Sequence, residues 1–151
     1  MSTEPDCRVG LEVAPWSYQV GREKIREFAR VLGHREAWYY DREAARAAGF
    51  RDVVAPPLFA VVYGRWMEPL IMEPALGVDY RRMLHGAQEF SFGAPVCSGD
   101  VVTTTARLDG VSTKKDLTFF ELSSVSLVQS EAGTALASEG RWTMIVRGGR
   151  E

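Results

Sequence analysis

The sequence predicts an α+β fold in which a long antiparallel sheet wraps around one buried helix. In the first half of the chain, apolar residues recur every three or four positions between charged ones, which is the periodicity of amphipathic helices. One segment in the middle, residues 58–63, is apolar at every position. The second half changes to an alternation of apolar and polar residues, which is typical of strands. Long strands that follow a single buried helix are expected to enclose it.

Composition indicates one globular domain and excludes several classes of function. With 151 residues, of which 46% are apolar and 25% are charged, the chain is long enough for a single core. Its net charge is −2 and its Lys and Arg residues are scattered among acids, so nucleic acid is not an expected partner. The two cysteines, Cys7 and Cys97, lack the spacing of zinc ligands, so no metal site is predicted.

The sequence has no features of a membrane anchor or of a signal peptide. Its apolar runs are far shorter than the roughly 20 residues that a membrane-spanning helix needs. The start of the chain is acidic, where a signal peptide would be basic. We therefore expect a cytoplasmic protein without a membrane partner.

The first half of the chain predicts an extended lead-in and then an amphipathic helix. Residues 1–15 show little periodicity, and ordered structure is expected to begin at Trp16. The helix has one apolar face and is expected to end near Gly33. The residues of that face are Ile25, Phe28, Ala29 and Leu32.

A second, short helix has recognisable ends. Asp41 is expected to be its N-cap, Glu43 lies in its first turn, and alanines form its body. Gly49 is expected to adopt the left-handed conformation that ends the helix.

A third helix is expected after two prolines. Pro56 and Pro57 suit the first turn of a helix, because proline has a helical φ and the N–H that it lacks would have no partner there. The segment that follows, residues 58–69, begins with six apolar positions, and a helix that is apolar on all sides is normally buried. We therefore expect this helix at the centre of the fold.

Four strands of roughly 8 to 12 residues are predicted in the second half of the chain. The alternating pattern occurs around Phe90 and Phe92 and over residues 101–108, 119–128 and 142–146. Turn-forming residues separate these segments, at Pro95 and at residues 98–100, 114–116 and 131–133. Asp109 and Gly110 are expected to form a bulge inside a strand.

Short motifs along the chain resemble the MaoC-like dehydratase group. They include His-Gly-Ala-Gln-Glu-Phe at residues 85–90 and Pro-Val-Cys-Ser-Gly-Asp at residues 95–100, with shorter matches at residues 18–20, 25–29, 40–45, 49–50 and 54–56. The chain is similar in particular to the N-terminal domain of fungal fatty-acid-synthase-type dehydratases and to the non-catalytic subunits of mycobacterial-type (3R)-hydroxyacyl-ACP dehydratases. The resemblance covers residues 16–147 and implies one hot-dog domain, in which a curved antiparallel sheet encloses a central helix. Residues 148–151 are then a tail.

The resemblance also implies which reactive residues this chain lacks. Catalytic members carry the frame Gly-Asp-x-Asn-Pro-x-His-x-Asp, whose first Asp handles the water or hydroxyl at the β carbon and whose His moves the α proton. In this chain His34 stands in place of that Asp and Tyr39 in place of that His, while the last Asp is retained as Asp41. An imidazole, and a phenol with a pKa of about 10, do not repeat those roles at neutral pH.

A third catalytic feature of the family is also absent. Catalytic members have His-Gly at the start of the central helix, where the glycine N–H stabilises the negative charge that develops on the thioester oxygen. Here Pro56 and Pro57 occupy these two positions, and proline has no N–H to donate. The resemblance therefore implies a chain that is inactive by itself.

The function implied is that of a non-catalytic subunit of a (3R)-3-hydroxyacyl-thioester dehydratase, in fatty-acid or polyketide assembly. A MaoC-like partner subunit would supply the missing Asp and His, and acyl carrier protein or coenzyme A would carry the acyl chain. The elimination of water needs no metal or redox cofactor. The candidate substrate-binding residues are Tyr39, Pro57, Phe59, Tyr63 and His85.

Two alternatives stay open from the sequence. One is a homodimeric hot-dog protein that binds an acyl or aromatic ligand without catalysis. The other is a standalone dehydratase with atypical catalytic residues, for which His34, Tyr39 and His85 are the candidates. The candidate residues also have ordinary structural explanations. His34 suits the C-terminus of a helix, and aromatic residues commonly fill a core. The two lysines at residues 114–115 are expected in a solvated turn, from which they could contact an acidic carrier protein.

Overall fold

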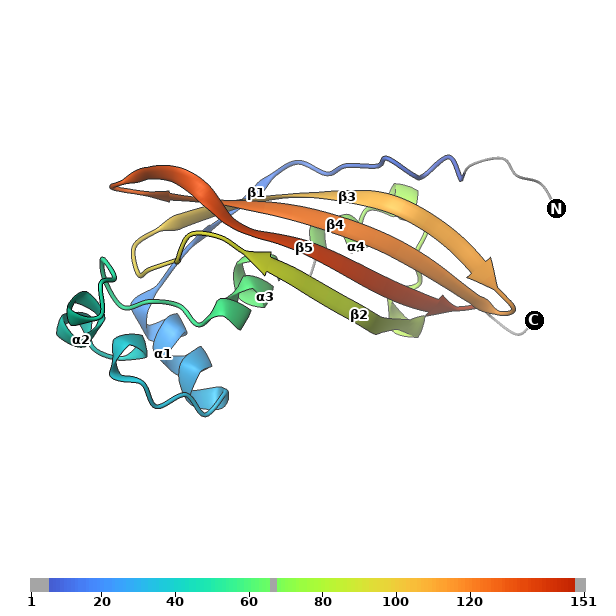
Figure 1. The fold of residues 1–151 in the computed structure, drawn as a ribbon. Helices are drawn as coiled ribbons and strands as arrows, with labels where there is room; N and C mark the ends of the chain where they lie inside the picture. Colours follow the sequence, from blue (N-terminus) through green and yellow to red (C-terminus); the bar gives the residue numbers. More distant parts are fainter. Residues whose placement is uncertain (1–5, 66–67, 149–151) are drawn as a thin grey trace.

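Five antiparallel strands form one continuous sheet with the spatial order β1-β3-β4-β5-β2 (Figure 1). The computed structural model describes residues 6–65 and 68–148. The strands are β1 (Trp16–Gln19), β2 (Met83–Phe92), β3 (Val101–Lys114), β4 (Leu117–Ser130) and β5 (Gly133–Arg147). The α+β class that the sequence predicts is confirmed.

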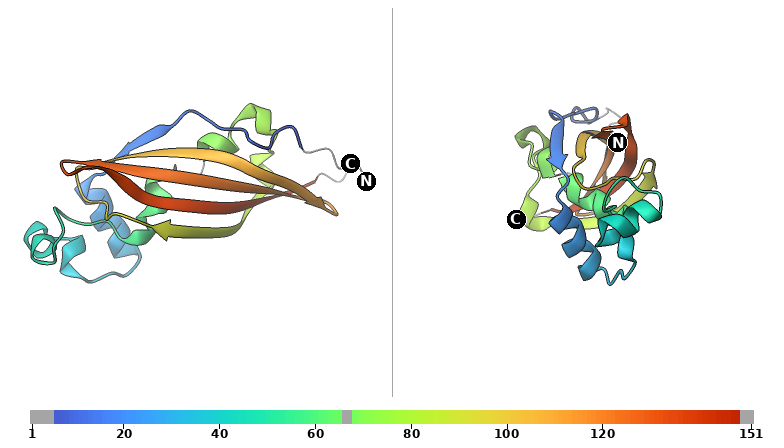
Figure 2. Two further views of the ribbon diagram at one scale, coloured as in Figure 1. Left: turned by 45° about the horizontal axis from the view of Figure 1, so that its top comes forward. Right: turned by 90° about the vertical axis from the view of Figure 1, so that its left-hand side faces the viewer.

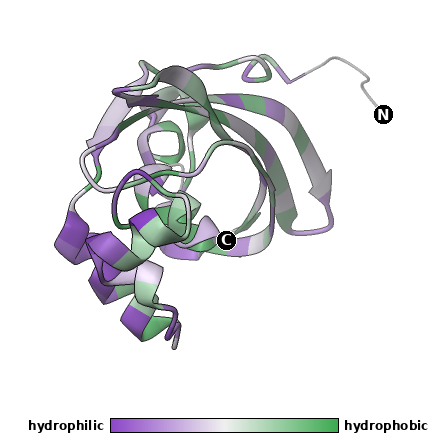
Figure 3. Cartoon of the chain, turned by 60° about the vertical axis from the view of Figure 1, so that its left-hand side comes forward, coloured by the Kyte–Doolittle hydropathy of each residue, from purple (hydrophilic) through white to green (hydrophobic). Residues whose placement is uncertain are grey.

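The helices are short and gather on one side of the curved sheet and at one of its ends (Figure 2). The α-helices are α1 (Arg22–Val31), α2 (Arg42–Ala47), α3 (Ala60–Tyr63) and α4 (Glu68–Ile71). Turns of 3-10 helix occur at Ala37–Tyr39, Pro57–Phe59, Pro74–Leu76 and Tyr80–Arg82. The outer surfaces of α1 and α2 are largely hydrophilic, whereas the strands alternate along their length (Figure 3). Within the described ranges, no helix has the length and apolar character needed to cross a bilayer.

Both predicted helices of the first half are confirmed, including their ends. α1 buries Ile25 completely and stops before Gly33. Asp41 caps α2, where its carboxylate accepts a hydrogen bond from the N–H of Ala44 at 2.8 Å. Gly49 follows with a φ of +94°, the left-handed conformation that commonly ends a helix.

Strands β3, β4 and β5 are longer than the sequence pattern predicts, with 14 or 15 residues each, whereas the 10 residues of β2 agree with the prediction. Pairing between β3 and β4 continues to Lys114 opposite Leu117, although the alternation of buried and exposed side chains fades there. The prediction ended too early because backbone hydrogen bonds can extend a ladder beyond its apolar part. The predicted bulge is confirmed by a register shift between Leu108 and Gly110.

The central helix is much shorter than the sequence predicts. It consists of one 3-10 turn, Pro57–Phe59, and the four residues of α3. Gly64 ends it, and Arg65 then adopts a left-handed φ of +47°, through which a right-handed helix does not continue. Its first residues are also not buried on every side, because Leu58 is 45% exposed. Residues 66–67, which the predicted helix included, lie outside the described part of the chain.

Two neighbouring groups of buried side chains form the core between α3 and the sheet. Phe59 belongs to the group that includes the buried face of α1, and its ring meets those of Tyr18 and Phe28 edge-on, with centroids 6.1 and 5.4 Å apart. Trp142 and Leu70 belong to the second group, which includes the buried face of α4. Because α3 is only one turn long, this burial holds it in place rather than its own helix propensity.

The lead-in is attached to the sheet earlier than the sequence predicts. The N–H of Gly10 donates to the carbonyl of Leu108 at 2.8 Å. The guanidinium of Arg8 pairs with Asp6 at 2.6 Å and donates to the carbonyl of Leu76 at 2.7 Å. Hydrogen bonds from Arg8 lower the pKa of the Asp6 carboxyl to about 2. Periodicity could not indicate this attachment, because backbone groups and one cation make it.

β2 lies at an edge of the sheet and is irregular near its start. Its register against β5 shifts between His85 and Ala87, so Gly86 is an extra, bulged residue. A Cβ at this position would come within 2.7 Å of Ile145 Cδ1 and 3.2 Å of the Thr143 carbonyl oxygen, so a larger residue would require these neighbours to move. On its outer side β2 has no neighbouring strand among the described residues.

Candidate functional site

A pocket of about 210 Å³ opens between the turn before α2, the start of the central helix and the end of β2. Residues 38–39, 50, 54–57, 63, 92–96 and 137 line it. All of these residues are apolar or aromatic, and none of the described lining residues carries a charge. A pocket of this character suits an apolar group such as a hydrocarbon chain or an aromatic ring.

Three of the five candidate binding residues line this pocket, namely Tyr39, Pro57 and Tyr63. Phe59 lies in the core instead, where its side chain is fully buried. His85 lies seven residues before the pocket end of β2, which corresponds to about 23 Å along a strand. The structure therefore brings part of the predicted set together and separates the rest.

His34 and Tyr39 lie side by side next to the pocket, with ring centroids 5.0 Å apart. His34 follows the C-terminus of α1, where its N–H donates to the carbonyl of Ala29 at 3.0 Å. Its Nδ1 is 3.6 Å from a carboxylate oxygen of Glu36. The hydroxyl of Tyr40 donates to the carbonyl of His34 at 2.5 Å, which fixes the turn. His34 thus packs behind Tyr39 and does not itself line the pocket.

His85 is exposed on β2 and stacks on Trp142, with ring centroids 5.4 Å apart and an angle of 24° between the planes. It borders a different surface groove, which it shares with Tyr80. A standalone enzyme would pair Tyr39 with either His34 or His85, and the structure brings only the first of these pairs together. His34 and Tyr39 are in contact, whereas His85 faces the other groove.

The start of the central helix presents two prolines to the pocket. Pro56 and Pro57 both line it. The N–H of Phe59 is used inside the turn, where it donates to the carbonyl of Pro56 at 2.8 Å. An oxyanion that formed at this place would find no N–H donor on residues 56 and 57.

Tyr63 provides a buried polar group in the pocket wall. The residue is 3% exposed, and its hydroxyl hydrogen bonds to the hydroxyl of Ser138 at 2.8 Å. Burial raises the pKa of the Tyr63 phenol above its ordinary value. The phenol therefore stays neutral at physiological pH, and its hydrogen bond is made within the protein.

Replacing Tyr63 by Phe is expected to destabilise the protein by about 1 kcal/mol at neutral pH, because the buried hydrogen bond to Ser138 is lost. The penalty should shrink as the pH rises through the ordinary tyrosine pKa of about 10. In that range Tyr63 loses its proton at a lower pH in the unfolded chain than in the folded chain, so the stability of the wild type falls as the pH rises. The Phe variant has no proton to lose at this position, so its stability does not fall for this reason. Urea unfolding at neutral and alkaline pH measures both effects.

The control is Tyr80→Phe, because Tyr80 is 56% exposed. This variant should match the wild type at both pH values. A destabilisation by Tyr63→Phe that stays constant with pH would contradict the effect of burial.

An ion pair holds the loop beside the pocket. Asp100 is 3% exposed, and its two oxygens accept hydrogen bonds from Arg51 at 2.8 Å each and from the N–H of Cys97 at 2.8 Å. The hydrogen bond to Asp100 raises the pKa of Arg51. The pair joins the loop after α2 to the turn before β3, and this positions Phe50 in the pocket wall.

Several lining residues are not indicated by the sequence pattern. Phe50 follows a helix-ending glycine, Phe92 ends a strand, and Ala137 lies in another strand. Local patterns mark the first two as element boundaries. They do not show that three distant segments meet at one pocket, because tertiary packing decides that.

Comparison with known families matches residues 8–137 to the FAS1-like dehydratase domain region. A UPF0336 protein of Saccharopolyspora erythraea is 38% identical over 146 residues, which cover 95% of this chain and 91% of that protein. A UPF0336 protein of Clavibacter michiganensis is 44% identical over 114 residues, which cover 75% of this chain and 76% of that protein.

Three solved structures share the fold. The C-terminally truncated HadBC (3R-hydroxyacyl-ACP dehydratase) complex of Mycobacterium tuberculosis matches with a TM-score of 0.74 and 24% identity, over 94% of this chain and 99% of that chain. The ChsH1-ChsH2 complex of the same organism matches with a TM-score of 0.70 and 22% identity, over 91% of this chain and 89% of that chain. A MaoC-like dehydratase of Rhodospirillum rubrum matches with a TM-score of 0.70 and 18% identity, over 95% of this chain and 94% of that chain. These matches confirm the hot-dog architecture, and the family match over residues 8–137 shows that the chain belongs to the FAS1-like dehydratase domain family, with the UPF0336 proteins among its relatives.

Proposed function

We propose that this chain is the non-catalytic subunit of a cytoplasmic (3R)-3-hydroxyacyl-thioester dehydratase, whose MaoC-like partner carries out the reaction. The observation that carries the proposal is an apolar pocket whose described lining contains no histidine or carboxylate. Tyr39 lines it where the catalytic frame has a histidine, and Pro56 and Pro57 line it where the family has an N–H donor. Such a pocket can hold an acyl chain but is poorly equipped to move protons.

The proposed reaction is the elimination of water from a 3-hydroxyacyl thioester carried by acyl carrier protein or coenzyme A. The histidine of the partner removes the α proton, and its aspartate assists the departure of the β hydroxyl as water. The product is a trans-2-enoyl thioester. The elimination is redox-neutral and requires no cofactor. The pocket of this chain contributes by binding the acyl tail, which keeps the reacting carbons in place.

β2 offers the edge through which a partner can extend the sheet. The strand has 10 residues, none of them Pro or Lys, and its Leu84 and Phe92 are 64% and 52% exposed. An open edge of this kind is normally paired or protected. Antiparallel pairing about a twofold axis would place the helices of both subunits on the same side of the joined sheet. The similar HadBC and ChsH1-ChsH2 structures are complexes, which supports an assembly for this chain as well.

Co-expression of this chain with neighbouring reading frames that retain the catalytic Asp and His tests the proposal. We expect a one-to-one complex by native mass measurement. The complex should dehydrate 3-hydroxyacyl thioesters at least about 10²-fold faster than the isolated chain, which lacks a positioned base. Robust turnover by the isolated chain would show that the subunit is catalytic.

The same edge and the same apolar pocket also fit a homodimeric ligand-binding protein. In that case β2 pairs with β2 of a second copy, and an acyl or aromatic ligand binds and is released unchanged. A stable homodimer that shows ligand binding without turnover, and that finds no partner on co-expression, favours this second function.

A further inference from the structure

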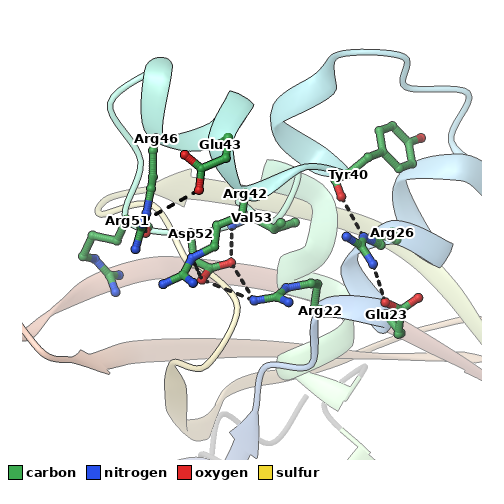
Figure 4. Close-up of polar contacts among 10 residues, drawn as sticks. All are labelled: Arg22, Glu23, Arg26, Tyr40, Arg42, Glu43, Arg46, Arg51, Asp52 and Val53. Carbon is green, nitrogen blue, oxygen red and sulfur yellow. Dashed lines mark hydrogen bonds and ion pairs between the residues drawn. The ribbon is translucent and has the colours of Figure 1, made fainter.

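A cluster of arginine side chains surrounds Asp52 on the outer side of α1 and α2 (Figure 4). Arg22 Nη2 lies 3.3 Å from one carboxylate oxygen of Asp52, and Arg42 Nε lies 3.1 Å from the other. Arg46 lies one turn further along α2, and its ion pair with Glu43 is long, at 3.9 Å. We name Arg22, Arg42 and Arg46 the arginine cluster. Its three cations are balanced locally by only two carboxylates.

The arginine cluster is accessible, whereas its main counterion is not. The three arginine side chains are 42%, 50% and 48% exposed, but that of Asp52 is only 16% exposed. Each guanidinium has five N–H donors, so the contacts with Asp52 leave donors for a further acceptor. Residues 22–52 contain eight Lys or Arg and six Asp or Glu. The whole chain contains 18 Lys or Arg and 20 Asp or Glu. Positive charge is therefore concentrated on this part of an otherwise acidic protein.

The arginine cluster lies next to the pocket. α2 carries two of its members and begins directly after the turn that contains Tyr39. Phe50, another lining residue, is tied to α2 by a hydrogen bond from its N–H to the carbonyl of Ala45 at 2.9 Å. It precedes Arg51, whose carbonyl accepts a hydrogen bond from Arg46 Nε at 3.4 Å. A ligand that fills the pocket and extends past Tyr39 or Phe50 would therefore approach the cluster.

We infer that the arginine cluster binds the phosphate of the thioester carrier while the acyl chain occupies the pocket. This inference rests on the function proposed above. The described pocket lining has no charge, so the anionic part of the carrier must be bound outside it. Arginine suits this role, because its planar fork pairs with phosphate oxygens in a bidentate manner. Coenzyme A and acyl carrier protein share a phosphopantetheine phosphate, which is the group assigned to the cluster.

The other candidate basic group is less well placed. Lys114 ends β3, and Lys115 lies in the turn between β3 and β4 that the sequence predicts. This turn lies at the opposite end of the sheet from α2 (Figure 1). With about 3.3 Å per residue, the 14 residues of β3 run for about 46 Å along the strand from one end of the sheet to the other. The contact with a carrier is therefore assigned to the arginine cluster.

The test is the hydration of 2-enoyl thioesters by the complex of this chain with its partner, comparing the wild type with the double variant Arg42→Glu, Arg46→Glu. With a coenzyme A thioester we expect KM to rise at least about tenfold, because charge-assisted hydrogen bonds are lost, with kcat unchanged. The increase should be smaller at high salt, which screens exposed charges. With an N-acetylcysteamine thioester, which has no phosphate, KM should not change.

The matched control is Arg107→Glu on β3. Arg107 is 55% exposed and pairs with Asp109 at 2.9 Å, so the variant makes the same kind of charge change elsewhere on the surface. Arg46→Gln is the milder variant of the cluster, because its carboxylate contact is already long, and it should raise KM in the same direction. Arg107→Glu should leave KM unchanged for every thioester.

The outcomes separate this inference from the proposed function. If the wild-type complex shows no turnover, both are overturned. If it turns over and KM for coenzyme A and carrier-protein thioesters is the same in all variants, only the inference is overturned. An equal rise of KM with the N-acetylcysteamine thioester also overturns it, because the effect would not depend on phosphate. A rise of KM with both the coenzyme A and the carrier-protein thioester supports the shared phosphate. A rise with only one of them overturns the inference, because a phosphate common to both carriers would affect both.

Discussion

In the proposed complex, replacing the catalytic histidine of the partner by Ala is expected to lower kcat by about 10²–10⁴, whereas Tyr39→Phe in this chain should change it by less than about threefold. A positioned general base supplies a rate factor of that size, and Tyr39 has no imidazole that could replace it. On the proposed function, Tyr39 therefore contributes far less to the rate than the histidine of the partner.

The measurement is the rate of dehydration by the complex at saturating substrate. His34→Ala in this chain is the companion variant, because His34 packs against Tyr39 at a centroid distance of 5.0 Å and would be its proton partner in a standalone enzyme. We expect a similarly small effect. A loss of a hundredfold or more in either variant, in a complex that still forms, would place catalysis in this chain.

Phe59→Ala is expected to lower the free energy of unfolding by about 4 kcal/mol, because it removes a large, completely buried side chain and leaves a cavity. The edge-to-face contacts with Tyr18 and Phe28 are lost at the same time. Phe59 is the only aromatic residue of the turn that starts the central helix, so little else is available to fill the space. Unfolding of the isolated chain in urea measures the change.

Leu58→Ala is the matched control, since Leu58 precedes Phe59 in the same turn but is 45% exposed. Its expected cost is about 1 kcal/mol or less, because only part of the side chain is removed from water on folding. If both variants were destabilised equally, the central turn would not have the orientation described above.

Local signals explain why much of the fold could be predicted. Asp41 and Gly49 identify the two ends of α2 from residue type alone, because one caps a helix with its carboxylate and the other adopts a left-handed conformation. Asp109 and Gly110 marked the bulge in β3 in the same way. The length of α3 could not be predicted from the sequence. It depends on the left-handed conformation of Arg65, and arginine does not normally signal the end of a helix.

The candidate site was predictable only in part. Tyr39 and Pro57 followed from their positions in a family frame, and both line the pocket. Phe59 and Tyr63 are four residues apart, a spacing that shares one face in a regular α-helix. The two residues do lie on one face, with ring centroids 6.4 Å apart in the same core group. Only Tyr63 also lines the pocket. Sequence periodicity identifies a buried face, but it cannot show which residue of that face borders a cavity, because tertiary packing decides that.

The bulge at Gly86 also has a consequence for the solubility of the subunit before it meets a partner. A long, regular, partly apolar edge would template uncontrolled strand addition and aggregation. The extra residue twists β2 locally and interrupts its even spacing of backbone groups, which leaves the stretch from Ala87 to Phe92 as the uninterrupted part. A short regular stretch is enough to pair with a strand of another folded chain, whereas stacking of misfolded chains is favoured by a longer regular stretch. The bulge thus limits the regular part of this edge, which lowers its tendency to add strands from misfolded chains.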